Sequence, residues 1–287
     1  MTTNGSLEER ISAALDGFSP KQRRLARFVL DNKYFMSFAS ASQAAEKTGS
    51  SAATVVRFAQ SLGYDGFSEM QAAIRADLPS YMTAVERMQA RLGQPPTGAD
   101  IPHNILATDI QNIQRTANNL VGAKLEKAVQ EIMQAGRILV VGSGISAGSA
   151  LFLAHSLKVT GFDANPALSG GLSLAVEVAG LRKGDLLAAI DLWRYSRATI
   201  QAVSAAKQQG VRTIAITDSI VSPLAEMADF AFEVATESVD HSLSPTAVVS
   251  LINVLIGMLS FIAPGKVLGS LRRVDAAYRD NDLLVID

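Results

Sequence analysis

The stretch Ile138–Ser149, which reads ILVVGSGISAGS, decides the fold of the larger part of the chain. Its four leading apolar residues predict a buried strand, and the glycines and serines after them predict a tight turn that opens a helix. Such a turn brings backbone amides close to an anion at the positive end of the helix. We therefore expect a phosphate- or polyol-binding loop, and a tight turn without a ligand is the alternative. The residues expected to line the loop are Gly142, Ser143, Gly144 and Ser146.

Short apolar runs alternate with helical stretches over the rest of this region. The runs are rich in β-branched residues and cover 137–141, 185–190, 212–217 and 230–235. This alternation predicts βαβ units around a parallel sheet flanked by helices, in a flavodoxin- or Rossmann-like arrangement. We place this α/β domain at residues 125–264 and expect a C-terminal helix or tail over 265–287.

The part of the chain before the α/β region predicts only helices. Residues 1–77 have the pattern of several short helices, and segments 80–92 and 104–120 are also helical in pattern. The GQPPTG stretch at 93–98 is the clearest linker. We therefore expect an all-α N-terminal domain at 1–77, followed by a helical linker at 78–124.

Residues 41–62 have the pattern of a helix-turn-helix. Ala45 is small enough to let two helices approach closely, and Gly49 tolerates the left-handed turn between them. Val55 and Phe58 then follow the steps of one buried helix face. The pattern predicts two short packed helices, and a generic helical hairpin in a core is the alternative.

In a docked helix-turn-helix, the start of the second helix meets base edges in the major groove of DNA. Arg57 is suited to donate two hydrogen bonds to a guanine, and methyl groups of Ala or Thr can pack on a thymine methyl. Cations in the neighbouring cluster at 21–27 would contact phosphates, which supply most of the affinity for DNA. The expected DNA-binding residues are Ser50, Ser51, Ala52, Ala53, Thr54, Arg57, Lys21 and Arg24.

Charge and composition narrow the function classes. The chain has 26 Lys and Arg against 27 Asp and Glu, a formal net charge of −1, so a nucleic-acid site must be a local patch. It has no cysteine, which fits a cytoplasmic protein, and its three histidines lack metal-ligand spacing. We therefore expect no metal and no cofactor. Residues 1–10 have no apolar core, so we also expect no signal peptide.

The apolar segment 247–264 is long enough to suggest a membrane span. It contains Ser250, Asn253 and Ser260, however, and it lacks a flanking cluster of Arg and Lys. We therefore expect a buried core helix or a subunit-interface helix here and no membrane partner. A membrane helix is the less favoured alternative.

Two neighbouring motifs resemble a known family. TVVRF at 54–58 and LGYDGFSE at 62–69 are similar to the N-terminal domain of RpiR-type regulators, which pair a helix-turn-helix with a sugar-isomerase-like (SIS) domain. Residues 125–264 resemble that SIS domain, most clearly at 153–161 and 214–229. The resemblance implies a transcription regulator with two kinds of partner, a double-stranded DNA operator and a sugar phosphate or sugar-acid-like effector. It also implies a homodimer or homotetramer.

The chain departs from the family at the second SIS loop, Ser-x-Ser-Gly-x-Thr, which cradles the sugar phosphate. Residues 191–196 read DLWRYS, in which only Ser196 keeps a hydroxyl, in the threonine place. Either the ligand is still anionic and Arg194 or Arg197 clamps it, or the ligand class has changed. The positive helix terminus favours a retained anion. Asp191 argues against it, because a carboxylate repels phosphate unless an arginine neutralises it.

Two further residues are candidates for the ligand site. Ser169 precedes Gly170 and Gly171 and holds the place of a loop that, in the family, often closes on the ligand. His241 lies just before the apolar segment and would line the pocket of its own subunit or of a partner.

These observations favour a DNA-binding regulator, of repressor type by family habit, over an enzyme. Aldose–ketose isomerisation needs a positioned base and acid, and the sequence assigns neither. A dimer formed through the apolar 247–263 helix would cover two half-sites, and the effector would reposition the two DNA-binding domains. The alternatives are a sugar-phosphate isomerase with a helical extension and a non-catalytic sugar-binding oligomer.

Overall fold

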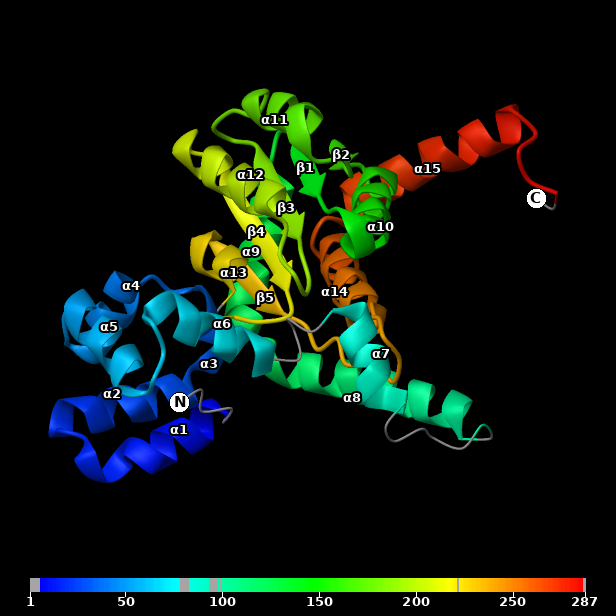
Figure 1. Ribbon diagram of the computed structural model, residues 1–287. Coiled ribbons are helices and arrows are strands. Elements are labelled where there is room, and N and C mark those ends of the chain that lie inside the picture. Colours follow the sequence, from blue (N-terminus) through cyan, green and yellow to red (C-terminus); the bar gives the residue numbers. More distant parts are fainter. Residues whose placement is uncertain (1–5, 78–82, 93–97, 99, 221, 286–287) are drawn as a thin grey trace. The chain divides into compact units, whose positions relative to one another are not determined.

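The chain folds into two compact units, Met1–Gly93 and Gln94–Asp287. The computed structural model describes residues 6–77, 83–92, 98, 100–220 and 222–285 (Figure 1). Most of the predicted 93–98 linker lies outside these described residues. The first unit is entirely helical within its described part and the second is α/β, which confirms the predicted combination of fold classes.

The N-terminal unit is a bundle of short helices. Its elements are α1 Leu7–Ala14, η1 Leu15–Gly17, α2 Pro20–Asp31, α3 Lys33–Phe38, α4 Ala41–Thr48, α5 Ala52–Ser61, α6 Phe67–Asp77 and α7 Ala84–Leu92. Capping boxes begin α1, α2 and α4, and in each a serine hydroxyl accepts the backbone N–H of the third helical residue. The core between the helices is apolar and includes fully buried Leu25, Val29, Phe58 and Met70.

The C-terminal unit alternates strands and helices. It begins with α8 Ile101–Asn119 and α9 Gly122–Gln134. The remaining elements are β1 Ile138–Val141, η3 Gly144–Ser146, α10 Ala147–Val159, β2 Ala164–Ala167, α11 Gly171–Ala179, β3 Leu186–Ile190, α12 Arg197–Gln208, β4 Arg212–Thr217, α13 Pro223–Met227, β5 Phe230–Glu233, α14 Thr246–Ile262 and α15 Pro264–Asp280.

The five strands form one parallel sheet in the order β2-β1-β3-β4-β5, which confirms the predicted parallel sheet. Ile138 and Val140 of β1 pack with α9, α10 and α14, whereas Leu139 and Val141 pack with α11, α12 and α13. Helices therefore cover both faces of the sheet (Figure 1). The strand order reverses between β1 and β3, and in such sheets ligands bind outside the carboxyl ends of the strands at this position.

Helix α14 confirms the expected core helix. Six of its residues are buried, and five of them, including Leu251, Leu255 and Leu259, belong to the same core as Ile138 and Val140 of β1. Within the described residues, no single helix combines the length and apolar composition needed to cross a membrane. Helices α14 and α15 meet those criteria only as a pair, and they are bent by 106° at their junction.

Candidate functional site

The turn between α4 and α5 has the conformation that the sequence predicts. Gly49 adopts a left-handed conformation with φ 62° and ψ 39°, and the next N–H, that of Ser50, donates to the Ala45 carbonyl at 2.8 Å. Ser51 caps α5, because its hydroxyl accepts the backbone N–H of Thr54 at 3.2 Å. Ala45 is buried, as the close approach of the two helices requires.

Helix α5 separates an apolar inner face from a polar outer face. Val55 and Phe58 are buried on the inner face, where the Phe58 ring packs against Phe18 at 5.5 Å between centroids. Ala53 and Arg57 are exposed and Thr54 is half-buried. The Arg57 guanidinium donates to the Thr54 hydroxyl at 3.4 Å. The leading residues of α5 therefore face solvent, as a helix that reads DNA requires.

The remaining DNA-binding candidates lie at the start of α5 or on α2. Ser50 is half-buried and Ser51 is exposed, both at the start of α5, and Ala52 is half-buried in its first turn. Lys21 and Arg24 are exposed on α2, which packs against α4 and α5. The same helical bundle therefore carries both the outer face of α5 and the cations expected to contact phosphates.

In the loop after β1, glycines allow neighbouring groups to come close to the backbone. A Cβ atom at Gly142 would lie 2.7 Å from the Ala150 Cβ, so only glycine fits there. Gly144 is left-handed, with φ 56°. Ser146 is fully buried, and its hydroxyl has no hydrogen-bond partner among the described residues. An unpaired buried hydroxyl is costly, so it marks a place where a bound group would complete the hydrogen bonding.

Two carboxylates accept hydrogen bonds from residues of the loop between β3 and α12. Asp191 is 5% exposed, and its Oδ2 accepts the backbone N–H of Ser196, the N-cap of α12, at 2.8 Å. Asp218, which follows β4, accepts the Trp193 backbone N–H at 3.2 Å and the Tyr195 hydroxyl at 2.7 Å. Trp193 and Arg194 both have positive φ, 54° and 23°, which is uncommon for residues with side chains.

Three carboxyl groups with raised pKa values end neighbouring strands. Burial raises the pKa of Asp191 to about 7, against the lowering effect of the Ser196 N–H, and the nearby Asp218 adds to the increase. Burial also raises the pKa of Asp218. The pKa of Glu233, the last residue of β5, is raised by burial and by Asp218. Shifted carboxyl groups of this kind are common at functional sites.

The structure brings most of the ligand candidates to one edge of the sheet. Gly142, Ser143, Gly144 and Ser146 follow β1, Ser169 follows β2, and Arg194, Ser196 and Arg197 follow β3, all at carboxyl ends of parallel strands. Ser169, Arg194 and Arg197 are exposed. His241 is exposed in the segment between β5 and α14, and no hydrogen bond or ion pair in the described structure joins it to these loops.

Asp218 and Glu233 were not predicted as site residues. The signal in the sequence was an acidic residue at the end of each of two apolar runs. Its meaning depends on the sheet order, which places β4 beside β3 and β5 beside β4. Glu177, another carboxylate of this unit, forms an ion pair with Arg137 at 2.7 Å.

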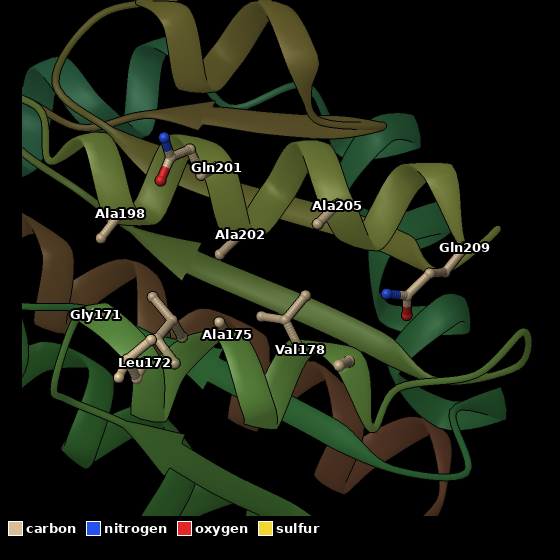
Figure 2. A pocket seen from close by; sticks show the side chains of 11 residues that line it. Gly171, Leu172, Ala175, Val178, Ala198, Gln201, Ala202, Ala205 and Gln209 are labelled. Carbon is tan, nitrogen blue, oxygen red and sulfur yellow. The ribbon is translucent and has the colours of Figure 1, made fainter.

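An apolar groove between α11 and α12 differs in character from the strand-end loops. Figure 2 shows its lining, which includes Leu172, Ala175 and Val178 of α11 and Ala202 and Ala205 of α12. Its volume is about 460 Å³, and no charged side chain lines it. None of the predicted ligand residues belongs to this lining, so the groove is not the predicted ligand pocket.

Comparison with known families identifies the class of protein. Residues 5–80 match the helix-turn-helix domain of the rpiR family, and residues 131–260 match the SIS domain. These matches cover both the α5 region and the strand-end loops. The chain belongs to the RpiR-type transcription regulators, which have a helix-turn-helix domain followed by a SIS domain.

Individual relatives agree with this assignment. An HTH-type transcriptional regulator of Haemophilus influenzae is 26% identical over 231 residues, which cover 80% of each chain. The sugar isomerase domain of an RpiR transcription factor from Sphaerobacter thermophilus is 38% identical, with a TM-score of 0.61 over 62% of this chain and 99% of that one. The Vibrio vulnificus NanR protein complexed with ManNAc-6P is 23% identical, with a TM-score of 0.67 over 95% and 98% of the two chains, and shares the fold.

Proposed function

We propose that this regulator binds its operator through α5 and is a repressor whose SIS domain senses a sugar phosphate or a related sugar-derived metabolite. The observation that carries the DNA-binding part is the orientation of α5. Val55 and Phe58 anchor one face of the helix in the core, while Ala53 and Arg57 remain exposed. A helix fixed in this way can enter a major groove without rearrangement.

The proposed contacts with DNA fall into two classes. Ser50, Ser51, Ala52, Ala53, Thr54 and Arg57 form the base-reading set at the start of α5. Arg57 would donate to a guanine, because its guanidinium can reach two acceptors on the base edge. Lys21 and Arg24 would contact phosphates, which position the helix without reading sequence.

The proposed effector site is the edge of the sheet where β1 and β3 end. The loop at 142–146 would form its centre, because Ser146 has a buried hydroxyl without a partner. Ser169, Arg194, Ser196 and Arg197 would surround the ligand, and His241 would come from the same subunit or from a partner. NanR is complexed with ManNAc-6P, so sugar phosphates are the first compounds to test.

Helix α8 is joined by hydrogen bonds to the chain segment that follows β5. Asn112 donates to the Glu237 carbonyl at 2.8 Å and accepts the Glu237 N–H at 3.2 Å, and Thr116 accepts the Ala235 N–H at 2.9 Å. These bonds tie α8 to the chain segment that leaves the sheet after β5. We propose that effector binding shifts this segment and α8 together, and that the helical connection at 78–124 transmits the shift to the domain at 1–77.

A sugar-phosphate isomerase is the second candidate, favoured by the raised pKa of Asp191, since a general base works best with a pKa near the operating pH. Two measurements on the full chain separate the candidates. A regulator binds DNA from its own promoter region in preference to unrelated DNA, and a sugar phosphate changes that affinity. An isomerase instead converts a sugar phosphate at a rate far above the background without any preference for the promoter.

A further inference from the structure

The N-terminus of α12 has the properties of an anion site, but a residue of the chain already occupies it. Backbone N–H groups at the start of a helix attract an anion, because they are unpaired and carry partial positive charge. In this helix of twelve residues the N-cap N–H, that of Ser196, donates to the Asp191 carboxylate at 2.8 Å. Asp191 is 5% exposed, so its carboxylate is a fixed part of the loop.

A second carboxylate holds the middle of the same loop. Asp218 accepts the backbone N–H of Trp193 and the hydroxyl of Tyr195. Trp193 and Arg194 adopt positive φ values, and a conformation that side chains disfavour persists only where surrounding contacts impose it. The hydrogen bonds to Asp191 and Asp218 are such contacts. The backbone N–H groups of Trp193 and Ser196 therefore already have acceptors within the chain.

The charges around this loop are unfavourable for a second anion. Asp191, Asp218 and Glu233 end three neighbouring strands, and the field of Asp218 acts on both of the others. The nearby Arg115 acts on Glu233. Arg194 and Arg197 are exposed, and neither forms an ion pair among the described residues. A phosphate over this loop would therefore meet Asp191 and Asp218, neither of which forms an ion pair among the described residues.

The loop after β1 has the opposite character. Gly142 and Gly144 expose backbone, no charged side chain lies between Gly142 and Ser149, and the buried Ser146 hydroxyl has no partner among the described residues. The edge of the sheet is therefore divided into an uncharged half with free hydrogen-bonding capacity and an acidic half, in which the backbone N–H groups of Trp193 and Ser196 already donate to carboxylates. Carboxylates accept hydrogen bonds from hydroxyl groups, which sugars carry in number.

We infer that Asp191 determines the specificity of the effector site, because its carboxylate takes the anion position at the start of α12. The effector presents an uncharged, hydroxyl-bearing part to the β3–α12 loop and places any phosphate elsewhere, away from this helix terminus. This inference rests on the proposed effector site at the carboxyl edge of the sheet, and it deepens that proposal by naming the chemistry that each half accepts.

Trp193 provides a direct probe, because it is the single tryptophan of the chain and lies in this loop. We would titrate the full chain with inorganic phosphate and follow Trp193 fluorescence. Asp191→Ser and Asp191→Asn both remove the carboxylate, and Asp191→Asn keeps the shape of the side chain and an oxygen that accepts the Ser196 N–H. We expect both variants to bind phosphate about tenfold more tightly than the wild type, or better.

Asp163→Ser is the matched control. Asp163 is exposed and precedes β2, at the opposite edge of the sheet, so its loss changes the net charge equally without opening the loop. This control should bind phosphate like the wild type. If Asp191→Ser does not fold, as circular dichroism would show, Asp191→Asn carries the test. Equal phosphate binding by the wild type and the folded Asp191 variants would overturn the inference, whether that binding is strong or absent.

The outcome is separable from that of the proposed function. If the chain shows no preference for its promoter DNA, the regulator proposal is wrong. The phosphate titration can still be interpreted in that case. A negative phosphate result with intact promoter binding would remove only the role of Asp191.

Discussion

In the proposed function, Arg57 contributes most to base recognition by α5. It is exposed on the outer face of α5, in the second turn of the helix, and its hydrogen bond to the Thr54 hydroxyl, at 3.4 Å, is long. We predict that Arg57→Ala weakens binding to the promoter DNA by about 1–3 kcal/mol and relaxes the sequence preference. Fluorescence anisotropy with promoter DNA and with unrelated DNA measures both effects.

Arg182→Ala is the control for Arg57→Ala. Arg182 is an exposed arginine of the C-terminal unit, so its loss removes the same charge far along the chain from α5. We expect promoter binding by this variant to match the wild type. An unchanged operator preference in Arg57→Ala would remove Arg57 from the base-reading set.

Asp191 makes the stability of the C-terminal unit depend on pH. Burial raises its pKa from 3.8 to about 7, so the folded chain holds this proton more tightly than the unfolded chain. The resulting stabilisation is fully present below the unfolded pKa and is lost as the pH rises through the folded value. We predict that the free energy of unfolding, followed in urea by Trp193 fluorescence, falls by roughly 1–4 kcal/mol between about pH 4 and pH 8.

Asp191→Asn should flatten this dependence, because the amide does not titrate. Asp218 and Glu233 also have raised pKa values, so part of the slope will persist in the variant. A stability that rises over this pH range, or a slope that Asp191→Asn leaves unchanged, would contradict the assignment.

At the residue scale, features that local rules determine could be predicted from the sequence. Gly49 was predicted from turn preferences, and it has the expected left-handed conformation. The burial of Asp191 was not predictable in this way, because a carboxylate is usually exposed and its burial depends on the Ser196 N–H that the folded loop supplies. The pairing of Asp218 with Tyr195 likewise requires the contact between two strand ends.

At the scale of elements, α8 is joined to the sheet by polar contacts. Asn112 is 1% exposed and bonds to both the N–H and the carbonyl of Glu237. We predict that Asn112→Ala lowers the stability of the C-terminal unit by about 1–3 kcal/mol, because the N–H and the carbonyl of Glu237 both lose their partner. Urea unfolding followed by Trp193 fluorescence measures this change.

Asn118→Ala is the matched substitution on the same helix. Asn118 is exposed, so this variant should change the stability by about 0.5 kcal/mol or less. If α8 also transmits the effector signal, Asn112→Ala will reduce the effect of a binding sugar phosphate on promoter affinity. Equal stability losses in both variants would show that the Asn112 contacts contribute nothing specific.

The strands that the sequence predicts and the strand that it misses differ in composition. β1, β3 and β4 are fully or almost fully buried and appear as continuous apolar runs, so they were predicted with nearly correct bounds. β2 reads ANPA and was missed, because Asn and Pro disfavour strands. Its place at the edge of the sheet explains how Pro166 is tolerated, since an edge strand needs fewer backbone donors.

At the scale of the whole molecule, several large apolar side chains of α14 and α15 are exposed. Phe261 is 88% exposed, and Ile262 and Leu268 are also exposed. A patch of large apolar residues on a single chain marks an interaction surface. We predict that Phe261→Glu weakens self-association and lowers promoter affinity by about tenfold or more, because a single domain covers only one half-site.

Leu172→Glu on α11 is the control for the interface, because Leu172 is also 88% exposed. Sedimentation velocity on both variants shows which surface joins the subunits. Dissociation by Phe261→Glu alone supports the interface at α14. Dissociation by Leu172→Glu alone would place the interface at the groove between α11 and α12 instead.

Methylation protection of the promoter DNA by the full chain is the most direct test of whether α5 reads the major groove. We predict protection of guanine N7 atoms, which lie in the major groove, in two patches about one helical turn apart. In Arg57→Ala, we predict that one guanine in each patch loses its protection while the flanking contacts persist. Bound complexes with no N7 protection, or with an unchanged pattern in Arg57→Ala, would contradict the account.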